Sequence, residues 1–317
     1  MTTLIAMTLC LAMDPSGGRP SVIVAIGAPG AAEYESEFRR WASLWRAAAE
    51  KAGADFAAIG DGAEEENPDR DRLRSALAER ADAGPEPIWL VLIGHGTFDG
   101  REAKFNLQGP DVTDAELLEW LKPVRRPVAV LNCASASGPF LTRLSGPNRV
   151  VVTATRSGDE QNFARFGQFL AESVADTAAD LDKDGQVSLL EAYLVAGGRD
   201  AEFYRTRARL ATEHPLIDDN GDRLGTPADW FRGVHAVRRA KDGAEPDGVR
   251  AHQFHLILND REKRMPPEKR ARRDELERSA AALRSKKDRI PEDEYYAQLE
   301  AVMVEIARLY RDATPAP

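Results

Sequence analysis

Residues 87–96 read PIWLVLIGHG, a run of apolar side chains that ends in the triplet Gly-His-Gly. A continuous apolar run bounded by turn residues is typical of a strand that is buried on both faces of a sheet. Residues 127–135, PVAVLNCAS, repeat this pattern and bring a cysteine to the end of the run. We therefore expect two parallel strands, one ending at His95 and the other at Cys133.

The remainder of the first half of the chain has the same alternating character. Apolar runs at residues 21–30, 54–60 and 149–158 predict three further strands. Amphipathic stretches lie between them, such as residues 33–53, and residues 113–121 begin with Thr and Glu at the spacing of a capping box. This alternation predicts an α/β fold with a mostly parallel sheet flanked by helices on both faces. Functional residues of such sheets lie at the carboxyl ends of the strands.

The composition is that of an ordinary globular protein. The chain has 317 residues, of which 43% are hydrophobic and 30% charged, and its formal net charge is −9. The negative charge argues against a protein that coats nucleic acid, so we expect no nucleic acid among its partners. We divide the chain into a leader (residues 1–20), a main domain (21–231), a linker or last strand (232–260) and a helical appendage (261–317).

An uncharged run, LIAMTLCLAM, occupies residues 4–13. It is too short to span a membrane, which takes about 20 apolar residues, so we expect no membrane span. The run fits the apolar part of a signal peptide, although the basic residues that usually precede it are missing; a buried first strand is the alternative. We expect a secreted or periplasmic protein, and otherwise a cytoplasmic one. Removal of the leader would take away Cys10 and leave Cys133 without a disulfide partner.

His95 and Cys133 are candidates for a catalytic pair. A thiol becomes a strong nucleophile when it loses its proton, and a neighbouring imidazole can accept that proton. The glycines beside His95 let the backbone turn and leave room for a substrate, and the amides of Gly96 and Cys133 could bind an oxyanion. Each residue alone also has a structural interpretation, because a cysteine after an apolar strand is usually a small core side chain.

A strand ending His-Gly followed by a strand ending in a cysteine resembles the clan CD cysteine peptidases, which include caspases and legumains. Their second strand usually ends Ala-Cys, whereas Asn132 precedes Cys133 here. Residues 153–166, TATRSGDEQNFARF, resemble the legumain segment that lines the pocket for the residue before the scissile bond. The matching positions there are Thr153, Ala154, Glu160, Phe163 and Ala164.

The resemblance implies a caspase-like fold and a cysteine endopeptidase acting on a protein or peptide, with Cys133 as nucleophile and His95 as base. The charges around the site conflict in sign, so the residue preferred before the cut stays open, as does the oligomeric state. Two alternatives use the same fold: a non-catalytic calcium-binding adaptor, and a transpeptidase or ligase using the same thiol. The substrate pocket is expected at Thr155, Arg156, Ser157, Asp159 and Glu160.

Residues 180–191, DLDKDGQVSLLE, have the pattern of an EF-hand calcium loop. Such a loop offers oxygen ligands at alternating positions, needs glycine at the sixth position, and ends in a carboxylate that binds with both oxygens. We expect a bound Ca²⁺ and helices on both sides of the loop. A second acidic segment begins at Asp218, but Arg223 stands where the glycine is needed, so it is either a second metal site or a turn. The predicted ligands of the first loop are Asp180, Asp182, Asp184, Gln186, Ser188 and Glu191.

The character of the chain changes after residue 231. Residues 261–289 are rich in Lys and Arg, and two stretches with helical periodicity meet at Pro291. This pattern predicts a C-terminal helical hairpin. It contains no nucleophile and no metal-ligand cluster, so we expect an accessory unit outside the catalytic site.

Overall fold

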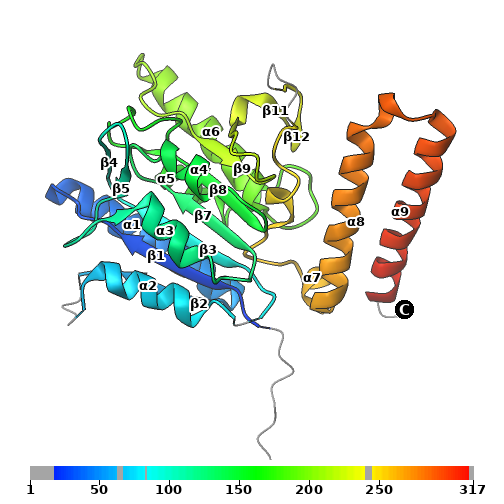
Figure 1. The fold of residues 1–317 in the computed structure, drawn as a ribbon, viewed down its shortest axis with the longest axis horizontal. Coiled ribbons are helices and arrows are strands. Elements are labelled where there is room, and N and C mark those ends of the chain that lie inside the picture. Colours follow the sequence, from blue (N-terminus) through cyan, green and yellow to red (C-terminus); the bar gives the residue numbers. More distant parts are fainter. Residues whose placement is uncertain (1–17, 63–66, 83, 240–244, 314–317) are drawn as a thin grey trace, which may run out of the picture.

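A seven-stranded sheet forms the centre of the computed structural model, which describes residues 18–62, 67–82, 84–239 and 245–313 (Figure 1). The strand order is β10-β9-β8-β7-β3-β1-β2. The five neighbouring strands β8, β7, β3, β1 and β2 run parallel to one another. At one edge, β9 pairs antiparallel with β8, and β10 pairs antiparallel with β9. The strands are β1 (Ser21–Ile26), β2 (Asp55–Ile59), β3 (Ile88–Ile93), β7 (Val128–Asn132), β8 (Arg149–Thr153), β9 (Leu216–Asp218) and β10 (Thr226–Pro227).

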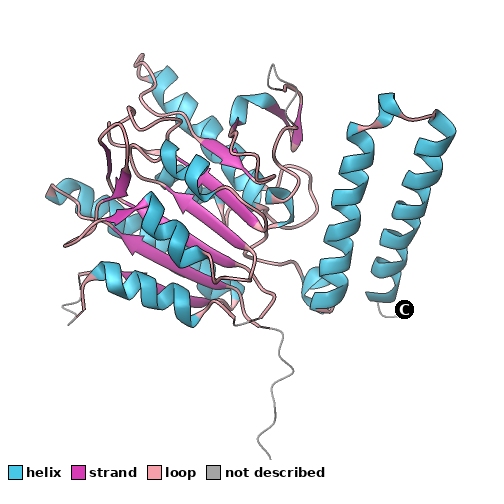
Figure 2. Ribbon diagram, in the orientation of Figure 1, coloured by secondary structure: helices cyan, strands magenta, loops and turns pink. Residues whose placement is uncertain are grey.

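Helices cover both faces of this sheet, as Figure 2 shows. Because side chains alternate along a strand, β3 sends Trp89 and Val91 into the core on one face, and Leu90 and Leu92 into the core on the other. Strands buried on both faces are therefore apolar throughout, which confirms the predicted α/β fold with a mostly parallel sheet. One face is covered by α1 (Ala32–Ala52), α5 (Phe166–Ser173) and α6 (Leu189–Thr206), the other by α2 (Asp69–Glu79), α3 (Asp114–Leu121) and α4 (Gly138–Leu144).

The boundaries of two helices follow directly from the sequence. The Thr113 hydroxyl accepts a hydrogen bond from the Glu116 amide, and the Glu116 carboxylate accepts one from the Thr113 amide, both at 3.1 Å. This confirms the capping box that begins α3. Helix α1 ends at Gly53, whose φ of +65° lies in the left-handed region that glycine adopts without strain.

Three short strands after β3 were not predicted. They form a separate three-stranded sheet of β4 (Gly96–Phe98), β5 (Ala103–Phe105) and β6 (Val112–Thr113). Residues 232–260, expected as a linker or last strand, add no strand to the central sheet among their described residues. They include β12 (His235–Ala236), which pairs with β11 (Phe231–Arg232), and an isolated bridge between His255 and Ser188. This segment therefore packs beside the predicted calcium loop.

The C-terminal helices form the predicted hairpin. Helix α7 (Asp260–Arg264) leads into α8 (Pro267–Ser285), which packs against α9 (Glu292–Ala313). Figure 1 draws the hairpin on the side opposite β4 and β5. Helix α8 joins the main domain through an ion pair of Arg270 with Glu86 at 2.5 Å and a hydrogen bond from Arg278 to Gln253 at 2.7 Å.

No described helix is long and apolar enough to cross a membrane. Most of the predicted leader, residues 1–17, lies outside the described residues. Export of the chain stays a prediction.

Candidate functional site

The pairing of β3 with β7 determines how far along the strands each side chain lies, and therefore how close it is to the carboxyl edge of the sheet. Leu92 pairs with Asn132, and the Cys133 amide donates to the Leu92 carbonyl at 2.9 Å. The same register, continued past the strands, puts Cys133 level with Ile93 and Ser135 level with His95. Each residue advances a strand by about 3.3 Å, so Cys133 lies roughly 7 Å deeper than His95.

Cys133 is a core residue on the face covered by α1 and α5. Its relative exposure is 1%, and it belongs to the same apolar cluster as Trp41. A Cβ added to Gly167 of α5 would lie 2.5 Å from the Cys133 Cβ, so this helix covers the thiol directly. Burial, and then the negative charge of Glu213, raise the pKa of the Cys133 thiol to about 12.

These observations argue against two sequence predictions for Cys133, its role as nucleophile and its amide as an oxyanion donor. A buried thiol with a raised pKa is not an activated nucleophile. Its amide also cannot serve as an oxyanion donor, because it is already bound to the Leu92 carbonyl within the sheet. The structural interpretation of this cysteine, a small core side chain, is the one that the structure supports.

His95 is held with a defined orientation at the end of β3. Its Nε2 lies 3.2 Å from the Pro29 carbonyl oxygen, and its ring contacts the rings of Tyr34, Phe38 and Phe163. Partial burial lowers the pKa of this imidazole below its usual value, so the ring is mostly neutral at pH 7. With Nε2–H donating to the carbonyl, Nδ1 is the basic nitrogen.

Ser135 is the polar side chain that the structure brings to the level of His95. The Gly96 amide donates to Ser135 Oγ at 3.2 Å, and Oγ donates to the Gly96 carbonyl at 3.3 Å. The two chains approach so closely that a Cβ on Gly96 would lie 2.4 Å from the Ser135 carbonyl oxygen, so glycine is required there. Ala136 then has a φ of +51°, which marks a sharp turn after Ser135.

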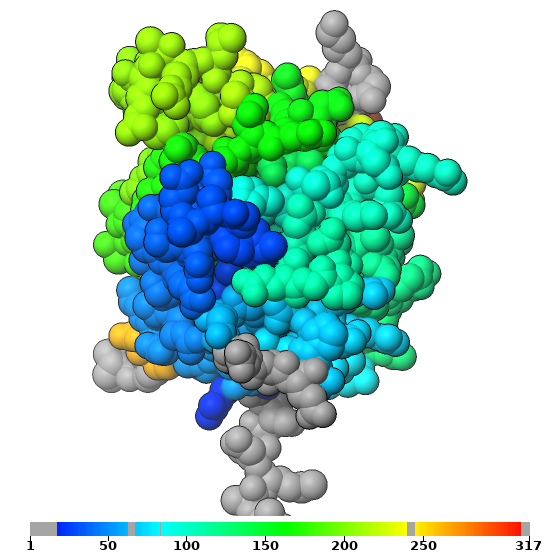
Figure 3. Space-filling view, turned by 90° about the vertical axis from the view of Figure 1, so that its left-hand side faces the viewer, coloured from blue at the N-terminus to red at the C-terminus, as the bar shows by residue number. Residues whose placement is uncertain are grey.

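Sequence reasoning missed Ser135, although one signal was present. The second strand of clan CD peptidases ends Ala-Cys, and Ala134-Ser135 supplies that alanine with serine in place of cysteine. The sequence analysis started from Cys133, which lies two residues earlier along the same segment. Figure 3 shows this face, with α1 in blue, the chain after β3 in teal and the chain after β8 in green close together.

Thr155 was expected in the substrate pocket, but it is a structural residue. Its relative exposure is 0%. Its hydroxyl oxygen accepts from the Gly138 amide at 3.0 Å and lies 3.1 Å from the Ser137 hydroxyl. These bonds tie the end of β8 to the start of α4, so the side chain is not available to a substrate.

The other predicted pocket residues form a turn beside Ser135. Glu160 organises it: its carbonyl accepts from the Ala136 amide at 2.8 Å, and its carboxylate accepts from the Arg156 amide at 3.0 Å. The same carboxylate lies 2.6 Å from His214 Nδ1. The Asp159 amide donates to the Ser157 hydroxyl at 3.2 Å. Arg156 is largely exposed, with Glu160 as its ion partner; that this turn lines a substrate pocket stays a prediction.

The loop at residues 180–191 has the backbone that its sequence predicts. Gly185 has a φ of +91°, and its amide donates to Asp180 Oδ2 at 3.1 Å. Oxygens of Asp180, Asp182 and Asp184 lie within 4.8 Å of one another. Asp180 Oδ1 is buried and has no hydrogen-bond partner among the described residues.

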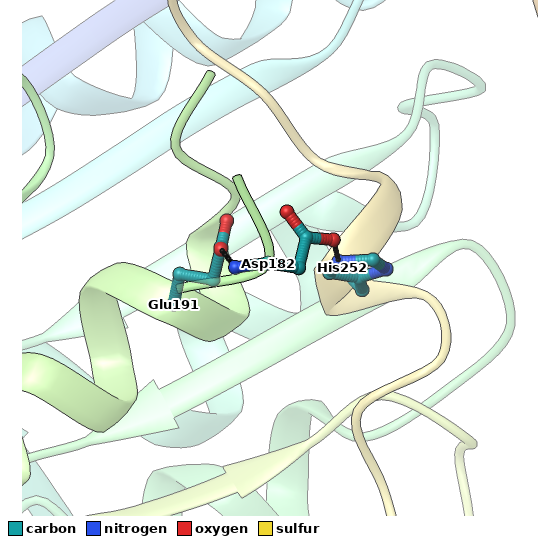
Figure 4. Close-up of side chains that lie close together, drawn as sticks. All are labelled: Asp182, Glu191 and His252. Atoms are coloured by element: carbon teal, nitrogen blue, oxygen red, sulfur yellow. Dashed lines mark hydrogen bonds and ion pairs between the residues drawn. The ribbon is translucent and has the colours of Figure 1, made fainter. Parts of the chain in front are cut away.

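Glu191 and His252 complete this acidic cluster. Glu191 is 1% exposed and, with His252 and Asp182, forms a group whose ligand atoms lie within 4.8 Å (Figure 4). His252 Nε2 lies 3.0 Å from Asp182 Oδ2, a contact that the sequence did not predict. Ser188 has another task, since its hydroxyl accepts from the Glu191 amide at 3.2 Å and caps α6. The Gln186 side chain accepts from the Asn259 amide at 3.2 Å.

One expectation around this loop needs correction. A continuous helix does not enter it: α5 ends at Ser173, and a 3-10 turn (Thr177–Ala179) precedes Asp180. The second acidic segment uses its carboxylates on backbone amides, as when Asp218 accepts from the Arg223 amide at 2.9 Å. It therefore has the bonding of a turn.

Comparison of the chain with models of known protein families gave no match, and neither did comparison with curated proteins. The function therefore has to be argued from the geometry alone.

Proposed function

We propose that the carboxyl edge of the sheet is a peptidase site in which Ser135 is the nucleophile and His95 the general base. The observation that carries this proposal is the orientation of the His95 ring by the Pro29 carbonyl at 3.2 Å, which leaves Nδ1 as the basic nitrogen on the residue next to Gly96, where Ser135 is bound. A nucleophile, a base beside it and a third group that orients the base are the elements of an activated hydroxyl.

The reaction would be a two-step acyl transfer. The Ser135 hydroxyl turns from the Gly96 carbonyl toward His95 and gives its proton to Nδ1 as Oγ attacks the scissile carbonyl carbon. The Gly96 amide donates to Oγ at 3.2 Å in the resting state, and it would have to leave Oγ for the oxyanion as the attack proceeds. His95 then returns the proton to the leaving amine, and water hydrolyses the resulting ester. The substrate class, a protein or peptide, comes from the resemblance to clan CD peptidases.

A peptide library incubated with the full chain tests this proposal. We expect Ser135→Ala and His95→Ala to lower the hydrolysis rate by about 10³-fold or more, and Cys133→Ala to leave it within about threefold of wild type. The rate should fall with acidity only below pH 6.5, because burial lowers the pKa of His95. Full activity in Ser135→Ala, or loss of activity in a folded Cys133→Ala, would contradict the assignment.

A second candidate is a non-catalytic peptide-binding module on the same fold. The observation that favours it is the state of Ser135, which is 2% exposed and has its hydroxyl bound to the Gly96 backbone in both directions. Such a module would bind library peptides without cutting them. The Ser135→Cys variant distinguishes the two candidates. If this variant hydrolyses peptides and wild type does not, the fold has the parts of a peptidase site except for a reactive nucleophile.

We also propose that residues 180–191 bind Ca²⁺ through Asp180, Asp182, Asp184, Glu191 and the Gln186 carbonyl. The buried, unpartnered Asp180 Oδ1 supports a cation here. Burial, together with the charges of Asp182 and Glu191, raises the pKa of Asp184, which indicates repulsion that a divalent ion would relieve. The ion would contribute stability, since it fixes the start of α6; no step of the reaction involves it.

A further inference from the structure

A cavity of about 420 Å³ lies between the C-terminal hairpin and the amino edge of the sheet. Pro20, Pro87 and Pro127, which precede β1, β3 and β7, form part of its wall, and α8 forms another part. It is therefore at the opposite edge of the sheet from Ser135 and His95. Its volume falls within the range of about 300–1,000 Å³ that is common for small-molecule sites.

Two arginines that line this cavity have only neutral hydrogen-bond partners among the described residues. Arg250 donates to the Asp219 backbone carbonyl and the Asn148 side chain, both at 3.3 Å. Arg278 donates to the Gln253 side-chain oxygen at 2.7 Å. Burial, and then the charge of Arg278, lower the pKa of Arg250, while the charges of Asp219 and Asp274 act in the opposite direction.

Neighbouring cations on the same wall are neutralised, which sets this pair apart. Arg270 pairs with Glu86 at 2.5 Å, and Arg273 pairs with Glu262 and Asp274, both at 2.7 Å. These pairs hold α8 in place. Arg270 and Arg273 are therefore held in close ion pairs, whereas among the described residues Arg250 and Arg278 have acidic neighbours only at longer range.

His255 lies in the wall of the same cavity, with one ring nitrogen buried behind its surface. Its Nε2 is buried and has no hydrogen-bond partner among the described residues. Burial, with the charges of His252 and Arg273, lowers the pKa of this imidazole to about 3, so the ring is neutral. A buried polar atom without a partner costs stability unless a ligand or water binds it.

We propose that this cavity binds a small molecule carrying two or more phosphate or carboxylate groups, held by Arg250 and Arg278 with His255 beside them. Guanidinium groups bind such anions with two parallel hydrogen bonds. The ligand would connect Arg278 of the hairpin to Arg250 of the main domain. The cavity is too small for a nucleic-acid duplex or a folded partner, which leaves small anions as the class.

Isothermal titration of the full chain with inorganic pyrophosphate, and separately with citrate, at low ionic strength tests this proposal. We expect saturable binding of at least one anion, weakened about tenfold or more in Arg278→Gln and in Arg250→Gln. Arg284→Gln is the control, because it removes the same charge from an exposed position of α8 outside the cavity. Binding only of pyrophosphate would assign the site to phosphates, and binding only of citrate to carboxylates.

The proposal is overturned if neither anion binds, or if Arg284→Gln weakens binding as much as Arg278→Gln does. Because Arg250 also contacts the backbone of the main domain, its variant is scored only if circular dichroism shows a folded protein. Arg278 makes a single side-chain hydrogen bond at the surface of α8, so its variant carries the test if the other unfolds.

Discussion

The two edges of the central sheet use opposite kinds of polar contact. At the carboxyl edge, His95 and Ser135 are uncharged and bind backbone groups: the Pro29 carbonyl, and the amide and carbonyl of Gly96. At the amino edge, charged side chains join α8 to the sheet, as in the pair of Arg270 with Glu86. Proton transfer needs a neutral base in a fixed orientation, whereas joining two units and binding an anion need permanent charge. On this ground we propose a separate task for each edge.

The largest effect should come from the close approach at the carboxyl edge. In Gly96→Ala the new Cβ would meet the Ser135 carbonyl oxygen at 2.4 Å, so one strand end must shift. We expect a loss of about 1–3 kcal/mol in unfolding free energy and about 100-fold in hydrolysis rate, since small displacements of reacting groups are costly. Gly198→Ala is the control, because a Cβ there meets nothing within 4 Å. A wild-type rate in Gly96→Ala would break the assigned role of this edge.

Calcium should stabilise the main domain as a whole and should not act on one edge of the sheet more than on the other. At a calcium concentration of 100 times the dissociation constant, a ligand that binds only the folded state adds about 2.7 kcal/mol. Thermal melting with calcium or with chelator measures this for wild type and for Glu191→Gln. Glu191 also accepts backbone hydrogen bonds, so only the calcium-dependent difference is informative. Glu202→Gln, an exposed change on α6, should keep the full shift; an unchanged wild-type melting temperature would mean that the loop binds no calcium.

The amino edge should affect stability but not the reaction. Arg270→Gln removes the ion pair with Glu86, in which both side chains are mostly buried. We expect a loss of about 1.5–3 kcal/mol, as for hydrogen bonds to charged groups, with a hydrolysis rate within twofold of wild type. Denaturant unfolding and the peptide assay measure the two effects. A large fall in hydrolysis rate for this variant would show that a change at the amino edge affects the carboxyl edge. The two edges would then not have separate tasks.

An effect that depends on pH should arise from a buried pair of carboxyl groups on the α5–α6 face. Burial, and then the charge of Glu213, raise the pKa of Asp200 to about 8. Folded Asp200 therefore keeps its proton where the unfolded chain loses it, from about pH 4 upward. Stability should fall as pH rises from about 4 to 8, by at most about 1.4 kcal/mol per pH unit from this group.

Asp200→Asn should reduce this slope, because the amide has no proton to lose. Denaturant unfolding at pH 5, 6.5 and 8 measures it, and Asp159→Asn, an exposed change, should leave the slope as in wild type. Asp247, whose pKa burial and Asp219 raise to about 8, should preserve part of the slope in both variants. An identical slope in wild type and Asp200→Asn would mean that Asp200 is ionised in the folded protein.

The sequence was sufficient where the information is local. Apolar runs predicted the parallel strands, and twelve consecutive residues predicted the turn at Gly185, because spacing within one segment determines these features. It was insufficient where two segments must be aligned. The depth of Cys133 depends on the register of β3 against β7, and the contact of His252 with Asp182 depends on how a distant segment packs. Neither can be read from the spacing of residues along the chain.

Thiol labelling tests the central claim, that Ser135 and not Cys133 faces His95. Folded wild type and the double variant Cys133→Ala/Ser135→Cys are treated with iodoacetamide at pH 7.5, and peptide mapping follows residues 133 and 135. We predict that Cys133 stays unlabelled until the protein is unfolded, because α5 covers the thiol and burial raises its pKa to about 12. Ser135 is also buried, at 2% exposure, but a cysteine there should be labelled in the folded state if His95 accepts its proton, as the proposed site requires. Rapid labelling of Cys133 in folded wild type would contradict the account.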